Sequence, residues 1–413
     1  MTTTDLLADV CELAEPAASD SVDGIAPRVV ARPASTQETS ALLRACHEQD
    51  LAVVVRGHGS KLAWGRPPER LDVLLDTTRM DELVEHSRGD LVATAGAGMP
   101  LARLQERLGQ GRHQLVVDDL VGGTLGGSTL GGAVATNLAG PRRMWVGSTS
   151  DVVIGVRFVR ADGTVAKAGG KVVKNVAGYD LSKLLTGSFG TLAVLTEVTV
   201  RLHPVPQASL WVGLTTPADH LAGVVAGLVS SQLVPHAVEV HVVPDQDPVV
   251  VALVTGTPDG AAARAEALAA GLGEQAWVAD EAPSWWGRLP TTGEAEEPRP
   301  LLLRATARLS GIPQLVGELS RHGASLTGSA GAGVLHASLP GTTAPEAAAA
   351  AVEAVRRTST ALGGSTVVLD AAPGTKRTLD SWGPVPALDL MRRVKAEFDP
   401  GRILAPGRFV GGL

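Results

Sequence analysis

The chain has 413 residues, of which 44% are hydrophobic and 19% are charged, and its formal net charge is −7. A chain of this length and composition exceeds one small core, so we expect two domains and exclude an intrinsically disordered protein. The negative charge gives no electrostatic basis for binding nucleic acid or an anionic membrane surface. Two cysteines are too few for a disulfide framework or a cysteine-ligated iron–sulfur cluster.

The N-terminal sequence MTTTDLLADV has neither the basic start nor the apolar stretch of a signal peptide. No uncharged apolar run in the sequence reaches the length that spans a membrane. We therefore expect a cytoplasmic protein with no direct membrane insertion, which could associate with a membrane through partner subunits.

Apolar periodicity predicts alternating helices and strands through the first half of the chain. Residues 36–50 have apolar positions at helical spacing, with Ser35 or Thr36 placed as the N-cap, and a proline opens a second helix over residues 100–108. The predicted strands are residues 51–56, 71–76, 91–95, 151–160 and 192–202. The sequence HPVP at residues 203–206 marks the first predicted domain boundary.

From Leu210 onward the predicted elements follow a βαββαβ order that occurs twice. The first copy has strands at residues 210–214, 237–243 and 249–254 and one reaching Trp277, with helices at 217–231 and 260–272. The second copy has strands at residues 301–308, 325–327, 333–339 and 366–370, with helices at 312–322 and 345–362. Two such copies predict one antiparallel sheet with helices on one face. A last helix over residues 384–398 precedes a tail whose proline and glycine content implies a fixed path over another surface.

Three glycine-bearing segments in the first half of the chain indicate a cofactor site. They are VVVRGHGSKLAWG at residues 53–65, the glycine-rich run at residues 117–147, and LLTGSFGTLAVLTEVTV at residues 184–200. Glycine loses more conformational freedom on folding than any other residue, so such runs gain little from packing alone. They do let backbone N–H groups approach a bulky anion, which suits a phosphorylated cofactor. The alternative reading of any one segment by itself is a flexible loop or a plain turn after a strand.

Several common site motifs are absent from the sequence. It has no GxGxxG opening a helix, no GxxxxGK[ST], no GxSxG and no HExxH, so a nicotinamide site, a nucleoside triphosphatase, a serine hydrolase elbow and a zincin are unsupported. His236 and His241 lie five residues apart on a predicted strand, so they face opposite sides and cannot chelate one ion.

The order and spacing of the remaining motifs resemble the FAD-binding domain shared by vanillyl-alcohol oxidase and p-cresol methylhydroxylase. The matching motifs are RGHGS, TLGGAVATN, WVGSTSDVVIG, ADGT, GYDLSKLLTGSFGTLAVLTEVTVRLHP and the ending MRRVKAEFDPGRILAPGRF, within residues 28–206 and 387–409. The resemblance implies an α+β fold with a two-subdomain FAD-binding domain over residues 1–206, completed by residues 376–413. Residues 207–375 are then a cap or substrate domain, with an antiparallel sheet covered by helices.

Within that family, the chain length and the LDSWGP…KAEFDP…PGRF ending are most similar to the FAD-binding subunits of bacterial glycolate oxidases. That similarity implies electron transfer from a small 2-hydroxy acid through flavin to a partner, and not to NAD. The implied partners are a second, larger flavoprotein subunit and an iron–sulfur subunit.

The resemblance also implies which residues bind FAD, with the pyrophosphate in the loop from Arg56 to Lys61. The implied residues are Arg56, Gly57, His58, Gly59, Ser60, Lys61, Asp118, Thr129, Gly132, Ala133, Thr136, Asn137, Gly190, Leu192 and Val194. Some relatives attach flavin covalently through a histidine in this loop. Here His58 precedes the second glycine and Ser60 stands at the linking position, so we expect noncovalent FAD.

Catalytic residues stay unassigned by the sequence. Lys174, Asn175, Tyr179 and Asp180 would lie near the flavin by resemblance, or they order a loop through hydrogen bonds. Relatives that oxidise 2-hydroxy acids carry a histidine- and acid-rich metal motif in the cap, and the comparable stretch GSAGAGVLHASLPG keeps only His336, so we expect no metal site.

Three functions therefore stay open. The chain is a subunit that passes electrons from a 2-hydroxy acid through FAD, a noncatalytic assembly or electron-relay subunit, or a stand-alone FAD-linked alcohol or sugar oxidase. The sequence specifies neither the substrate, nor the electron acceptor, nor the subunit stoichiometry.

Overall fold

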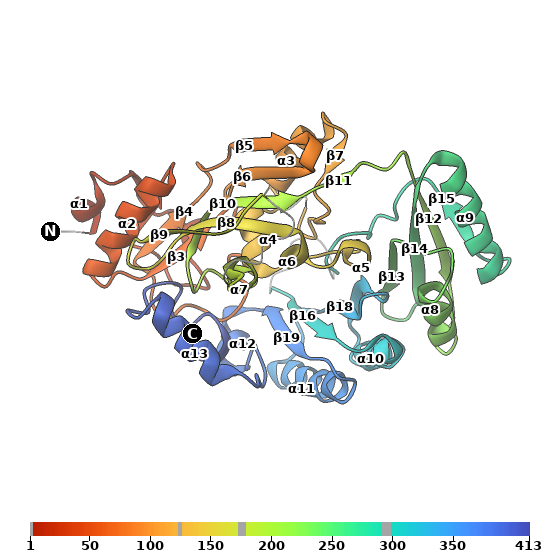
Figure 1. Ribbon diagram of the computed structural model, residues 1–413. Coiled ribbons are helices and arrows are strands. Elements are labelled where there is room, and N and C mark those ends of the chain that lie inside the picture. Colours follow the sequence, from red (N-terminus) through yellow and green to blue (C-terminus); the bar gives the residue numbers. More distant parts are fainter. Residues whose placement is uncertain (1–2, 123–125, 172–178, 291–298) are drawn as a thin grey trace. The chain divides into compact units, whose positions relative to one another are not determined.

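The computed structural model describes the chain except for residues 1–2, 123–125, 172–178 and 291–298 (Figure 1). The described chain divides into two compact units. Unit 1 comprises Met1–Leu138, Ser148–Val205 and Pro384–Leu413, and unit 2 comprises Ala139–Gly147 and Pro206–Gly383. No helix within the described ranges is long and apolar enough to cross a membrane.

The first sheet of unit 1 has the strand order β1-β2-β4-β3, in which β2, β4 and β3 run parallel. Its strands are β1 (Glu12–Ala14), β2 (Val29–Arg32), β3 (Val53–Arg56) and β4 (Val73–Asp76). Helix α2 (Thr36–Glu48) connects β2 to β3, and the Ser35 hydroxyl caps it by accepting a hydrogen bond from the Glu38 N–H. The predicted helix and its Ser35 cap are thus confirmed. Leu404 of the C-terminal tail lies beside Val53 in a parallel bridge, so the tail follows β3.

The second sheet of unit 1 has the strand order β5-β6-β10-β8-β9 and is antiparallel. Its strands are β5 (Leu83–Ser87), β6 (Val92–Gly96), β8 (Val153–Val159), β9 (Val165–Gly169) and β10 (Val194–Arg201). Helix α4 (Leu130–Thr136) packs on β6 and β10. The remaining helices and strands of the unit are α1 (Thr3–Leu7), α3 (Leu101–Gly109), β7 (His113–Gln114), α6 (Thr149–Val152), α7 (Leu181–Leu185), β11 (His203–Pro204) and α13 (Leu388–Phe398).

Several parts of unit 1 differ from the sequence-based expectation. The strand predicted over residues 151–160 begins with a helical turn, α6, because the Asp151 carboxylate accepts hydrogen bonds from the Ser148 N–H and hydroxyl and closes that turn. Helix α4 was not predicted, because it lies inside the glycine-rich run, whose composition disfavours a helix. Strands β1, β2, β5 and β7 were also not predicted, and each has at most five residues.

Unit 2 contains two consecutive βαββαβ copies in one eight-stranded sheet. The first copy is β12 (Ala208–Thr215), α8 (Leu221–Val229), β13 (Ala237–Val242), β14 (Val249–Gly256), α9 (Pro258–Leu272) and β15 (Trp277–Ala279). The second copy is β16 (Leu301–Thr306), α10 (Ile312–Arg321), β17 (Ser325–Ser329), β18 (Val334–Leu339), α11 (Pro345–Ala361) and β19 (Thr366–Asp370). The unit also holds α5 (Arg143–Val146) and α12 (Pro373–Thr378).

The strand order of this sheet is β15-β12-β14-β13-β17-β18-β16-β19, and its neighbouring strands are antiparallel. The two copies are arranged in mirrored strand order and meet where β13 pairs with β17. The predicted duplication and the α+β fold class, with an antiparallel sheet covered by helices, are confirmed.

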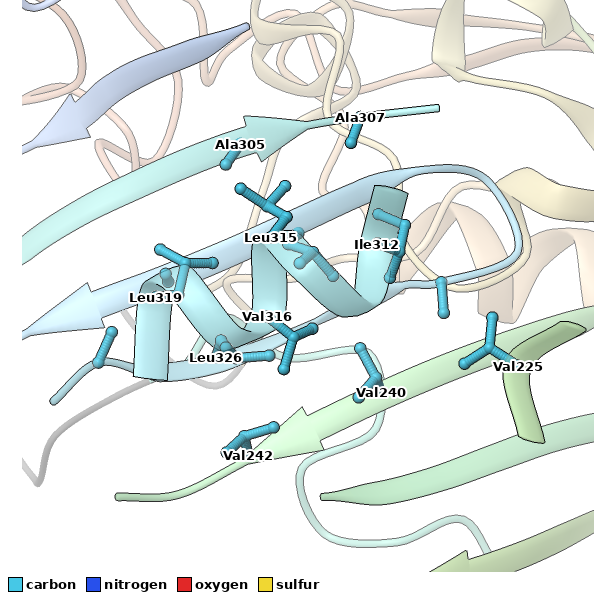
Figure 2. Close-up of a cluster of buried hydrophobic side chains, with 14 of the residues drawn as sticks. Val225, Val240, Val242, Ala305, Ala307, Ile312, Leu315, Val316, Leu319 and Leu326 are labelled. Atoms are coloured by element: carbon cyan, nitrogen blue, oxygen red, sulfur yellow. The ribbon is translucent and has the colours of Figure 1, made fainter. Parts of the chain in front are cut away.

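One buried cluster joins the helices of unit 2 to one face of the sheet. Figure 2 shows Ile312, Leu315 and Leu319 of α10 packed over the strands that carry Val240 and Leu326. Because side chains alternate along a strand, residues between these positions point to the opposite face, which carries the polar side chains described below.

Candidate functional site

The loop after β3 begins with an arginine that is held in place by two carboxylates. Arg56 forms ion pairs with Asp20 and with Asp76, the latter at 2.8 Å. Burial alone would lower the pKa of Arg56, but the hydrogen bonds to Asp20 and Asp76 outweigh it and raise that pKa. This guanidinium therefore fixes the start of the RGHGS loop and carries no uncompensated charge.

The RGHGS loop lies against the second glycine-bearing segment. A Cβ atom at Gly57 would overlap the Thr129 side chain, so this side chain packs on the Gly57 backbone at a distance that only glycine permits. Thr129 caps helix α4 by accepting a hydrogen bond from the Gly132 N–H at 3.2 Å. Gly132 is also tightly placed, because a Cβ there would lie 3.1 Å from Thr129 Oγ1 and 3.9 Å from Lys61 Nζ.

The third segment joins the other two through backbone hydrogen bonds. The Gly187 N–H donates to the Val134 carbonyl at 2.9 Å, and the Phe189 N–H donates to the Ala135 carbonyl at 2.8 Å. Phe189 has a φ of 55°, an uncommon left-handed conformation for an aromatic residue. Three segments that are distant in sequence thus converge on one place in unit 1.

Two adjoining hollows, which we call the cradle, lie where these segments meet. The first hollow opens to solvent, measures about 550 Å³, and is lined by Val54, Val55, Arg56, Gly57, His58, Gly59, Ser60, Lys61, Leu62, Thr129, Gly132, Ala135, Thr136, Phe189 and Arg408. The second encloses about 500 Å³, is lined mainly by small and apolar residues including Gly131, Gly190 and Ala193, and shares Gly57, Gly132 and Phe189 with the first. The cradle thus has one wall of cations and hydroxyl groups and one slot of small residues. A phosphorylated flavin needs both properties.

Most of the residues that the resemblance implied for FAD line the cradle, and five do not. Those in the cradle are Arg56, Gly57, His58, Gly59, Ser60, Lys61, Thr129, Gly132, Thr136 and Gly190. Those outside its lining are Asp118, Ala133, Asn137, Leu192 and Val194. Binding of FAD by each residue stays a prediction. Sequence reasoning missed Ser128, Asp119 and Arg408, although Arg408 lies in the PGRF ending that carried part of the resemblance.

Of the four residues expected near the flavin, Lys174 and Asn175 lie outside the described residues. The Tyr179 side chain is 95% exposed. The Asp180 carboxylate accepts hydrogen bonds from the Ser182 hydroxyl and the Lys183 N–H, so it caps helix α7. For Asp180 this is the loop-ordering role that the sequence left open.

The face of the unit 2 sheet opposite α10 carries a row of polar residues on adjacent strands. His241 on β13 pairs in register with Thr327 on β17, which pairs with His336 on β18, which pairs with Arg304 on β16. Their side chains share one face because paired residues of an antiparallel sheet point the same way. Arg143 of α5 lies near this row, because its positive charge lowers the pKa of both Arg304 and His336. We call Arg143, Arg304 and His336 the basic cluster.

Arg304, in the middle of the basic cluster, carries positive charge without a carboxylate partner among the described residues. Burial lowers the pKa of Arg304, and Arg143 lowers it further. No carboxylate among the described residues forms an ion pair with Arg304. Burial, Arg304 and Arg143 together lower the pKa of His336 to about 3, so its imidazole is neutral. Such an environment favours an anion, and a carboxylate matches the guanidinium geometry.

The histidines do not form a metal site within the described chain. His241 stacks on Trp285 with ring centroids 4.7 Å apart, and His236 Nδ1 lies 2.9 Å from Thr255 Oγ1. Across the described residues, no group of three or more His, Cys, Asp or Glu side chains is placed to hold a metal ion. His336 has two arginines as charged neighbours, which oppose binding of a cation.

Residues 27–169 match the family model described as an FAD binding domain. Among curated proteins, the chain is 38% identical to a D-lactate dehydrogenase of Archaeoglobus fulgidus, over 44% of this chain and 41% of that protein. It is 41% identical to the glycolate oxidase subunit GlcE of Escherichia coli, over 38% of this chain and 44% of that protein. It is 32% identical to the glycolate oxidase subunit GlcD of Bacillus subtilis, over 52% of this chain and 45% of that protein. The matched part thus spans less than half the length of these relatives.

A solved structure of alkyldihydroxyacetonephosphate synthase matches the fold with a TM-score of 0.67 and 18% identity. The match covers 92% of this chain and 76% of that protein, and at this identity it supports the fold alone. Together with the family model, these similarities confirm the resemblance predicted from the motifs and confirm FAD as the cofactor.

Proposed function

We propose that this chain belongs to an enzyme that oxidises a small 2-hydroxy acid. The premise is that residues 27–169 form an FAD binding domain of the vanillyl-alcohol oxidase type. Bound FAD supplies a two-electron acceptor for such an oxidation. Unit 1 holds the cofactor in the cradle, and unit 2 acts as the cap that recognises the substrate. Relatives named D-lactate dehydrogenase and glycolate oxidase subunit support this class of substrate.

The basic cluster is the observation that carries the choice of an acid over a neutral alcohol or sugar. A fold loses stability by holding a partly buried guanidinium beside another cation and without a carboxylate. A substrate carboxylate would compensate Arg304 through charge-assisted hydrogen bonds, each stronger than a neutral one. His336, which is neutral, leaves that charge balance unchanged and can accept or donate one hydrogen bond.

The cradle fits a noncovalently bound FAD. His58 Nδ1 lies 3.2 Å from the Gly126 carbonyl oxygen, and Ser60 stands where relatives with a covalent link place the linking residue. We expect acid precipitation of the purified protein to release the yellow colour into the supernatant. Flavin that stays in the pellet would contradict noncovalent binding.

The test of the substrate class uses the visible spectrum of the full chain. We expect anaerobic addition of a 2-hydroxy acid such as lactate or glycolate to bleach the flavin, and neutral alcohols and sugars to leave it oxidised. The Arg304→Met variant should keep its FAD and bind the acid about 10- to 100-fold more weakly, since it removes a charge-assisted hydrogen bond. The matched control is Arg357→Met, because Arg357 is exposed on α11.

Other outcomes of this test favour the two other functions. A colourless preparation that cannot be reconstituted with FAD would favour a noncatalytic assembly subunit. Bleaching by an alcohol or sugar, with no effect of a 2-hydroxy acid, would favour a stand-alone oxidase.

We further propose that electrons leave this chain for partner subunits, a second flavoprotein and an iron–sulfur protein. The relatives that are named as subunits support this proposal. Isolating a tagged copy from its native cell should recover these partners in fixed proportion, whereas recovery of the tagged chain alone would contradict it.

A further inference from the structure

Lys61 is a cation in the cradle whose hydrogen-bond partners are hydroxyl groups. Its Nζ donates to Ser128 Oγ at 2.6 Å and to Ser60 Oγ at 3.4 Å. Ser128 Oγ donates in turn to Asp119 Oδ1 at 2.6 Å, and the Ser128 N–H donates to Asp119 Oδ2 at 2.8 Å. The Ser128 hydroxyl therefore lies between Lys61 and the Asp119 carboxylate. Lys61 forms no ion pair with a described residue.

The other charged or titratable side chains around this hollow have partners of their own. Arg56 is held by two carboxylates, as described above. The Arg408 guanidinium donates to backbone carbonyl groups, including that of Leu62 at 2.6 Å. His58 faces a backbone carbonyl oxygen. Lys61 is thus a buried cation of the cradle that pairs directly with hydroxyl groups and with no described carboxylate.

Burial disfavours the charged form of Lys61. It lowers the pKa of the ammonium group to about 8, although Asp119 opposes the shift. An ammonium group that has lost water without gaining a carboxylate lacks compensation for its charge. A pyrophosphate placed in the same hollow would provide that compensation.

We propose that Lys61 is the counterion of the FAD pyrophosphate and that the chain Lys61–Ser128–Asp119 makes retention of FAD depend on pH. The proposal rests on the FAD cradle of the proposed function and not on the choice of substrate. A bound anion favours the charged form of Lys61, so at a pH above the pKa of the empty site FAD binding takes up a proton. The affinity for FAD is therefore highest below that pKa. It falls as the pH rises through the pKa, by up to about tenfold per pH unit for one proton.

The experiment titrates FAD into the full chain after its flavin has been removed, at several pH values on both sides of the Lys61 pKa. Flavin fluorescence gives the affinity, and calorimetry in two buffers with different ionisation enthalpies counts the protons taken up. Riboflavin, which lacks the phosphates, is the second probe. We expect FAD affinity to fall at high pH with proton uptake, and riboflavin affinity to change little.

Three variants separate the charge of Lys61 from its packing. Lys61→Met should bind FAD more weakly and lose the pH dependence. Lys61→Arg should lose the pH dependence while keeping much of the affinity, because a guanidinium stays charged throughout this range. Lys167→Met, which alters an exposed lysine on β9, should behave as the unchanged chain. Thermal melts of all three show whether each variant is folded.

Two results would overturn the proposal. One is an FAD affinity that does not change as the pH crosses the Lys61 pKa, and the other is a Lys61→Met variant that retains the original pH dependence. Because the measurement is cofactor binding, a chain that passes this test and is not bleached by a 2-hydroxy acid refutes only the substrate class.

Discussion

Two buried cations, Lys395 in unit 1 and Arg304 in unit 2, are balanced differently. In unit 1, Lys395 Nζ donates to Asp399 Oδ2 at 2.6 Å and to the carbonyl oxygens of Thr191 and Leu404 at 2.7 and 2.9 Å. In unit 2, Arg304 on the face of the sheet opposite α10 has Arg143 as its charged neighbour and no described carboxylate partner. The first arrangement is complete without a ligand. The second leaves a partly buried charge uncompensated, and an anionic ligand would compensate it. We therefore assign substrate binding to the second arrangement.

The largest effect should come from breaking the complete arrangement. Lys395→Met leaves the Asp399 carboxylate buried without its cation, which we expect to cost about 3–5 kcal/mol in free energy of unfolding. Chemical denaturation of the full chain measures this, with Lys167→Met as the exposed control. A loss no greater than in the control would show that Lys395 is not the structural cation that its contacts indicate.

A smaller effect should come from filling the space that glycine leaves in the cradle. Gly132→Val adds a branched side chain to the cradle wall, 3.1 Å from Thr129 Oγ1, and we expect this crowding to weaken FAD binding by about 1.4–2.8 kcal/mol, or about 10- to 100-fold. Fluorescence titration of FAD measures this loss. Gly223→Val is the matched control, because Gly223 is also helical and has no atom within 4 Å of the added Cβ. A folded Gly132→Val variant with unchanged FAD affinity would show that FAD does not lie against Gly132.

The smallest effect, and the one of opposite sign, concerns the incomplete arrangement. Arg304→Met removes a partly buried charge next to another of the same sign, so the free energy of unfolding should stay unchanged or rise by about 1 kcal/mol. The same denaturation experiment compares it with Lys395→Met. A strong destabilisation would mean that Arg304 is a structural residue, and the comparison between the units would fail.

Features that depend on neighbouring residues could be predicted from the sequence. Ser35 caps α2 through the Glu38 N–H three residues ahead, and the duplicated βαββαβ order follows from local periodicity. The cradle loops could be predicted because runs of glycine gain little from packing and so indicate a special backbone requirement. Gly57 and Gly132 meet such a requirement, since the Thr129 side chain lies close to both. Helix α4 was missed for the same reason, since its glycines oppose a helix that packing on β6 and β10 stabilises.

Features that depend on distant residues could not be predicted in this way. The row from His241 to Arg304 exists because four strands pair in one register, and a shift of one residue would turn those side chains to the other face. The resemblance named Asp118, whereas Ser128 donates its hydrogen bonds to Asp119, a neighbour with the same chemistry. Only the path of the loop distinguishes two adjacent aspartates.

The seam between β13 and β17 has a consequence for the order of folding. Every other hydrogen-bonded strand pair described in the eight-stranded sheet joins strands of the same copy. Each half of the sheet can therefore form its own strand pairs before it contacts the other half. Only the pair β13–β17 then has to form between segments that are far apart in sequence. The unit thus avoids the slow long-range search that a sheet of this width otherwise requires.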